Sequence, residues 1–316
     1  MFIVQHRRFF YIFSGVIIAA SVAALAIWGL KPGIDFTGGS LLEITYPDGR
    51  PEKTELEKAL ARLDFAEQNL GGRAPLVVDA SVRPTRENGY IIRMKDLTET
   101  EQTNVRDAVS FNGRQKIVEE RFGAVGPLLG KEAVGKSFVA IVFVILCIVL
   151  FITFAFRKVS EPVSSWKYGI ITIVALIHDV LVPTGAFAIL GHFAGFEVDT
   201  LFVTALLVVL GFSVHDTIVV FDRVRENLRI SHEVRDRKPF DVIVGESIQQ
   251  TFVRSINTSL TTVLALVMLY FIGPEITKHF SLALGIGIVA GTYSSIFIGS
   301  PLLVTVEKWQ NKKRGV

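Results

Sequence analysis

One stretch of the chain has the residue types and spacing of a nucleotide-binding loop. GKEAVGKS, residues 130–137, matches the pattern G-x-x-x-x-G-K-[ST] at every specified position. In this pattern glycine N–H groups hold phosphates, the lysine reaches the outer phosphates and the hydroxyl binds Mg²⁺. Gly130, Gly135, Lys136 and Ser137 would supply these groups, so an ATPase is one hypothesis.

Ionisable residues inside apolar segments form a second group. His178–Asp179 lies in ITIVALIHDVLVP, His215–Asp216 in LLVVLGFSVHDTIVVFDR, and Arg254 in TFVRSINTSLTT. Such groups cost several kcal/mol at membrane depth unless they are paired or hydrated, which favours a functional role. An Asp216–Arg254 ion pair that alternates with a protonated, unpaired Asp216 would carry a proton.

Each of these groups also has a structural interpretation. Asp179, with His178, could form a proton path or a hydrogen bond that packs helices, and Arg254 could extend to the membrane surface. Asn257 and Thr258 could line a wet path or bond across helices. Adjacent helical residues diverge by about 100°, so one side chain of each His–Asp pair should face inward, which disfavours a metal site. We expect no catalytic residue, metal or cofactor, and protons as the coupling ion.

Composition indicates that these residues lie in a membrane protein. Of 316 residues, 50% are hydrophobic, mean hydropathy is +0.46, and the net charge is only +3. Apolar runs long enough to span a bilayer as helices occur at 9–30, 137–156, 169–190, 200–221, 258–273 and 280–304. The first run exceeds a typical signal peptide, although a cleavage pattern could be argued at Ala24–Ala26. The single cysteine, Cys147, is expected to pack as a small hydrophobe.

This context argues against the nucleotide-binding interpretation. GKEAVGKS leads directly into an apolar run and follows no buried strand, so we interpret it as a flexible connection with Gly130 and Gly135 as hinge candidates. GIGIVA at 285–290 resembles a dinucleotide fingerprint but lies within the sixth run. Gly285, Gly287 and Gly291 are better explained as small residues for close helix packing.

Basic residues predict the orientation. They lie before the first run, between the second and third, in the connection 222–250 and in the tail 305–316, whereas the other connections carry few. The positive-inside rule places both termini in the cytoplasm, residues 31–136 outside, and residues 137–304 as the rest of the bundle.

Residues 31–136 have the patterning of a soluble α+β domain. SLLEITYP, LVVDASV, GYIIRMK and QKIVEERF read as strands, and TELEKALARL as a helix. Capping boxes are predicted at Thr54/Glu57 and Thr98/Glu101. The order βαββαβ predicts a small ferredoxin-like domain. The fold class is thus an α-helical, six-span bundle with one small α+β domain.

Four motifs resemble the SecF family of the SecDF protein-export complex. They are GIDFTGG (33–39), HDV in the third run, GFSVHDTIVVFDRVRENLR (211–229) and ESIQQTFVRSINTSLTT (246–262). The first contains Gly33, Asp35, Gly38 and Gly39, the family motif that follows the first span. The resemblance implies that Asp216 and Arg254 form the proton path; His215 could tune Asp216 or face a neighbouring helix.

The resemblance also implies an architecture and partners. The chain would be a bacterial inner-membrane subunit that resembles half of an RND-type transporter. It would pair with SecD beside the SecYEG channel and act on exported unfolded polypeptides. Proton motive force would drive this work, without enzymatic activity or nucleic acid. The alternatives are a scaffold that carries no protons and half of a small-molecule/proton antiporter.

Overall fold

The computed structural model describes residues 2–68, 81–85, 88–156, 163–234 and 238–314. The chain divides into two compact units. The helical unit comprises Met1–Lys31 and Phe138–Val316, and the sheet unit comprises Pro32–Ser137. The second range lies within one residue of the domain expected at 31–136.

Six helical segments in the described part of the chain are long and apolar enough to cross a membrane, as predicted. Five of these segments are single helices: α2 (Arg7–Trp28), α6 (Pro127–Ala155), α7 (Ser165–Phe193), α8 (Thr200–Glu233) and α9 (Phe240–Ile272). The sixth is composite: α10 (Glu275–Ser294), the π-helical turn η1 (Ser295–Gly299) and α11 (Ser300–Arg314). A short helix, α1 (Phe2–Gln5), precedes them.

Several helices exceed the predicted apolar runs. α8 continues to Glu233 and α9 begins at Phe240, so much of the connection expected at 222–250 is helical. The Arg223–Glu226 and Arg225–Asp222 ion pairs stabilise this extension of α8. The tail expected at 305–316 is helical through Arg314. Hydropathy locates the apolar part of a helix, whereas polar turns continue beyond it.

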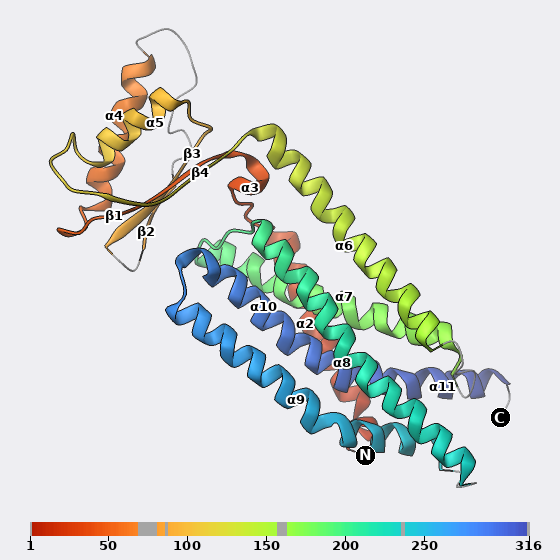
Figure 1. Cartoon of the computed structure of the whole chain (residues 1–316). Helices are drawn as coiled ribbons and strands as arrows, with labels where there is room; N and C mark the ends of the chain where they lie inside the picture. Colours follow the sequence, from red (N-terminus) through yellow and green to blue (C-terminus); the bar gives the residue numbers. More distant parts are fainter. Residues whose placement is uncertain (1, 69–80, 86–87, 157–162, 235–237, 315–316) are drawn as a thin grey trace. The chain divides into compact units, whose positions relative to one another are not determined.

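α10 is the central helix of the helical unit, where it packs against α7, α8 and α9 (Figure 1). In the most apolar 18-residue stretch of the sixth segment 67% of the residues are buried, compared with 6% in that of α6. A Cβ at Gly291 would lie 2.9 Å from the Cβ of Ser213, and one at Gly287 would overlap the Val209 side chain. These two glycines therefore permit close contact with α8, as predicted, whereas Gly285 has open space around its Cα.

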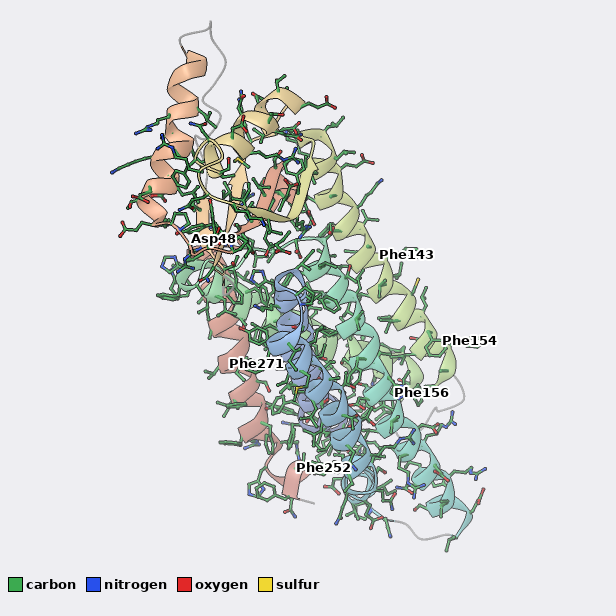
Figure 2. The ribbon with its side chains drawn as sticks, turned by 60° about the vertical axis from the view of Figure 1, so that its left-hand side comes forward. Asp48, Phe143, Phe154, Phe156, Phe252 and Phe271 are labelled. Carbon is green, nitrogen blue, oxygen red and sulfur yellow. The ribbon has the colours of Figure 1, made fainter. Side chains whose placement is uncertain are left out.

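α6 presents most of its surface outward. Phe143 and Phe154 project from its outer side and are 62% and 64% exposed (Figure 2). Cys147 is also exposed on this helix, so its expected burial is wrong. The error has a simple cause: apolar sequence indicates burial in lipid or in protein alike.

The sheet unit contains a four-stranded antiparallel sheet in the order β2-β3-β1-β4. The strands are β1 (Gly39–Thr45), β2 (Ser81–Pro84), β3 (Gly89–Met94) and β4 (Val118–Val125). Helices α4 (Lys53–Gln68) and α5 (Glu99–Val109) pack on one face through a core that includes Leu42, Ile92, Leu60 and Val105. Most of the strand expected at LVVDASV lies outside the described residues.

One of the two predicted capping boxes is present. At the start of α5, Thr98 accepts a hydrogen bond from the Glu101 N–H, and the Glu101 carboxylate accepts one from the Thr98 N–H. The box predicted at Thr54 is wrong, because α4 already begins at Lys53 and the Thr54 hydroxyl instead donates to Glu52.

Candidate functional site

Asp216 is buried where α8 faces α9 and α10. Its side chain is 2% exposed, and its Oδ2 has no hydrogen-bond partner among the described residues. Ser255 of α9 and Thr292 of α10 are the hydroxyl residues beside this carboxyl group. Ser255 Oγ is also buried without a partner in the described chain. A buried polar atom without a hydrogen-bond partner destabilises the folded state. The presence of two such atoms in one region therefore indicates a role other than packing.

Arg254 lies one residue before Ser255 but points away from the helical unit. It is exposed, and no ion pair joins it to Asp216 in the part of the chain described, although the two charges interact electrostatically. The expected direct ion pair is therefore not formed in this structure. Adjacent helical residues diverge by about 100°, and Ser255 takes the inward position.

Three further polar side chains of α8 and α9 are exposed. They are His215, Asn257 and Thr258, and the Thr258 hydroxyl donates to the Arg254 carbonyl. We call His215, Arg254, Asn257 and Thr258 the polar strip. Asp216 is buried and the adjacent His215 is exposed, as expected if only one side chain of the pair faces the interior.

Asp179 has a different environment. It is fully buried, and His178 Nδ1 lies 2.9 Å from its Oδ1. Its Oδ2 accepts hydrogen bonds from Ser213 Oγ of α8 and from Ser294 Oγ of α10, the second at 2.8 Å. Both members of this pair face protein, contrary to the divergence prediction, because α7 packs against α2, α8 and α10.

Further hydroxyls join α8 and α9 to the sixth segment, and the sequence analysis did not name them individually. Thr217 Oγ1 lies 2.9 Å from Ser295 Oγ, and Ser259 of α9 bonds to Thr292 of α10. Serine and threonine are common in membrane helices, so only their three-dimensional partners distinguish these ones. The available signal was their position within GFSVHDT, SINTSLTT and GTYSS.

The segment 33–39 forms a tight connection in the sheet unit. Gly33 precedes the short helix α3 (Ile34–Thr37), which has Asp35 in its first turn. Gly38 and Gly39 have φ of 74° and 124°, conformations that favour glycine. A Cβ would lie 2.7 Å from Pro127 Cα at Gly38 and 2.5 Å from the Met94 carbonyl oxygen at Gly39. The two glycines thus allow close backbone approach as well as the turn.

Residues 130–137 belong to α6 and form no phosphate-binding loop. Gly130 and Gly135 lie inside continuous helix, and Lys136 pairs with Glu132 at 2.8 Å across one turn. A Cβ at Gly130 would lie 2.9 Å from both the Gly38 nitrogen and the Phe36 carbonyl oxygen. The expected flexible connection is thus helical, and Gly130 serves a close contact with the Gly38 turn. Among the described residues, no cluster of three or more His, Cys, Asp or Glu could hold a metal.

Comparison with known proteins identifies the family. The family model described as protein export membrane protein SecD/SecF, C-terminal, matches residues 105–309, and the SecD/SecF GG motif matches 23–46. The chain belongs to the SecF family. It is 45% identical to protein translocase subunit SecF of Thermobaculum terrenum, over 98% of this chain and 94% of that one. For SecF of Anaerolinea thermophila the identity is 37%, over 99% and 97% of the two chains.

The fold also resembles a crystal structure of SecDF, a translocon-associated membrane protein from Thermus thermophilus. The TM-score is 0.77 at 28% identity, over 98% of this chain and 38% of the SecDF chain. This SecF-family chain is therefore a multi-pass membrane protein with a role in protein export, and it corresponds to about two fifths of the longer protein.

Proposed function

We propose that this chain is the proton-carrying subunit of a membrane complex that uses the proton gradient to help export polypeptides through the Sec channel. The observation that carries the proposal is Asp216, a buried carboxyl group in a membrane segment with an unsatisfied oxygen and hydroxyl residues beside it. A carboxyl group in this position can bind and release one proton per cycle.

Arg254 supplies the complementary charge. With Asp216 ionised, the guanidinium group stabilises the carboxylate, and with Asp216 protonated this attraction is lost. The side chain is long enough to change position between the two states, and in the present structure it lies on the exposed surface. Proton binding to Asp216 would thereby change the electrostatic attraction between α8 and α9.

The proposed partner is SecD, which would supply a second six-span half. The chain spans 38% of the SecDF chain that it resembles, and the polar strip is exposed within otherwise apolar membrane segments. A polar surface at membrane depth is costly against lipid but not against a polar partner. The complex would act beside SecYEG on unfolded polypeptides, without enzymatic activity.

The remaining architecture fits this function. The sheet unit is proposed to be ferredoxin-like, which its βαββαβ order and its sheet order β2-β3-β1-β4 support. We place it outside the bacterial inner membrane, with both termini in the cytoplasm, on the distribution of basic residues. One proton crossing 100 mV releases about 2.3 kcal/mol, enough to bias a two-state movement of such a unit.

A secretion assay with two variants tests the proposal. Asp216→Asn keeps the shape of the side chain but cannot ionise, and Arg254→Ala removes the complementary charge. In cells that lack the native copy, both should abolish gradient-dependent secretion while SecD still co-purifies. Normal secretion by Asp216→Asn would exclude the proton-carrying role. Loss of SecD co-purification would instead favour a scaffold, the alternative in which the buried charges only hold the helices together.

A further inference from the structure

We propose that Asp179 is a second proton-binding group of the transport cycle and that it holds the irregular turn of the sixth segment in one of two hydrogen-bonding states. The inference deepens the proposed function and rests on it. It concerns a four-residue cluster that joins three helices, namely His178, Asp179, Ser213 and Ser294.

The donor set allows Asp179 to be charged although it is fully buried. His178 Nδ1 and the hydroxyls of Ser213 and Ser294 surround its two oxygens. Hydrogen bonds to a carboxylate favour its charged form, whereas burial favours its neutral form. The hydrogen bonds and the burial therefore act in opposite directions on the two forms of the carboxyl group, and proton exchange requires that both forms can exist.

His178 is the second ionisable member of the cluster. Its Nε2 is buried and has no partner among the described residues. The other titratable groups nearby are Tyr293, whose ring stacks on His178 at 5.9 Å, and Asp216.

Asp216 lies three residues after Ser213, so the two share one face of α8 about one turn apart. Both positions face α10, because Ser213 approaches Gly291 and Asp216 neighbours Thr292. Asp179 and Asp216 therefore contact successive parts of α8 and α10, the first through Ser213 and Ser294 and the second beside Thr292.

The hydrogen bonds of Ser294 provide the second state. Its hydroxyl lies 2.8 Å from Asp179 Oδ2 and 3.0 Å from the Gly291 carbonyl oxygen, so an intrahelical acceptor is available when Asp179 becomes protonated. Ser294 directly precedes the π-helical turn η1. Such turns occur frequently at functional sites inside helices. Protonation of Asp179 would weaken its bond from Ser294, since a neutral acceptor binds less strongly than a charged one, and would favour the alternative bond to the Gly291 carbonyl oxygen.

α7 has an irregularity at the same place. Pro183 lies inside this helix and has no N–H, so the Asp179 carbonyl loses its ordinary intrahelical donor. The two segments that Asp179 connects are therefore irregular beside the carboxyl group itself. This arrangement suits a movable contact better than a permanent one.

The decisive measurement is the infrared difference spectrum between high and low pH, with the full chain in its complex with SecD. We expect the spectrum to contain a protonated carboxyl band that Asp179→Asn removes and Ser294→Ala shifts. Ser281→Ala is the matched control, because Ser281 is equally buried on α10 but donates only to the carbonyl of Lys278 within its own helix. A spectrum that Asp179→Asn leaves unchanged would overturn the inference.

Secretion provides the second readout. Asp179→Asn cannot bind or release a proton, so we expect loss of gradient-dependent secretion while SecD still co-purifies. Ser294→Ala should reduce secretion at least about tenfold, as loss of a hydrogen bond to a charged group can, and Ser281→Ala should not. If Asp179→Asn fails to assemble, equal secretion by the two serine variants counts against the inference. If Asp216→Asn abolishes secretion and Asp179→Asn does not, the role of Asp179 is excluded and the proposed function stands. If secretion by Asp216→Asn is normal, the proposed function is excluded as well.

Discussion

At the scale of single residues, the two intramembrane aspartates differ in how well their oxygens are satisfied. Asp179 accepts hydrogen bonds on both oxygens, whereas Asp216 Oδ2 has no partner among the described residues. A satisfied carboxylate can lock helices together, but an unsatisfied one favours a conformation in which a proton or a counter-charge arrives. Asp216 is thus the stronger candidate for direct proton exchange.

Glu101 allows a residue-scale prediction in the sheet unit. Burial raises its pKa, but the Thr98 N–H and hydroxyl and the nearby Lys95 outweigh burial, so the pKa lies below the ordinary 4.5. A lowered folded pKa means that the capping box stabilises the folded state above about pH 4.5. This stability is lost as the pH falls through the lowered value.

Thr98→Ala should lower the local stability of α5 by about 1 kcal/mol at neutral pH, since an N-cap is lost. Hydrogen exchange of peptides from 99–109 should accelerate several-fold at pH 7, and the difference from the unaltered chain should shrink under acid conditions. Thr103→Ala is the control, because its hydroxyl only donates to the Glu99 carbonyl within the helix. Equal acceleration in both variants would contradict a specific role for the cap.

At the scale of elements, the sequence predicted the helices and the order of the strands well and the contacts between helices poorly. Apolar runs and period-two alternation are local signals, so the six segments and β1 and β3 were found. The partners of Ser213 and Ser294 depend on how α7, α8 and α10 rotate against one another, which no local pattern contains. Asp216 could be selected as a candidate from the sequence because a carboxylate in an apolar run is rare.

The start of α6 gives an element-scale prediction with an internal control. Gly130 approaches the backbone of Phe36 and Gly38, whereas Gly135 has open space around its Cα. Gly130→Ala should displace the Gly38 turn at a cost of about 1–3 kcal/mol, as overpacking does. Gly135→Ala should stabilise the helix by up to about 1 kcal/mol.

Hydrogen exchange of residues 34–39 would separate the two glycine variants. We expect faster exchange in Gly130→Ala only. If both variants instead slowed secretion without changing exchange or SecD co-purification, the glycines would act as a hinge, the interpretation that their sequence context first suggested.

At the scale of the whole molecule, charge predicts which side of the membrane each part occupies. Residues 222–250, which include the end of α8, the connection to α9 and the start of α9, contain five arginines, whereas the connection between α7 and α8 contains no lysine or arginine. Translocation of a basic connection is disfavoured, so the α8–α9 connection should be cytoplasmic and the sheet unit should lie outside. This orientation would let proton entry from outside drive the sheet unit on the side of the membrane to which the proposed substrates are exported.

Single-cysteine labelling tests this orientation. In a Cys147→Ser background, Asp48→Cys places a thiol on an exposed turn of the sheet unit, where Asp48 is labelled in Figure 2. Glu233→Cys places one at the exposed end of α8. A membrane-impermeant maleimide should label Asp48→Cys in intact spheroplasts and Glu233→Cys only after permeabilisation. The reverse pattern would invert the proposed direction of proton flow through Asp216, because the proton-rich side would then face the α8–α9 connection.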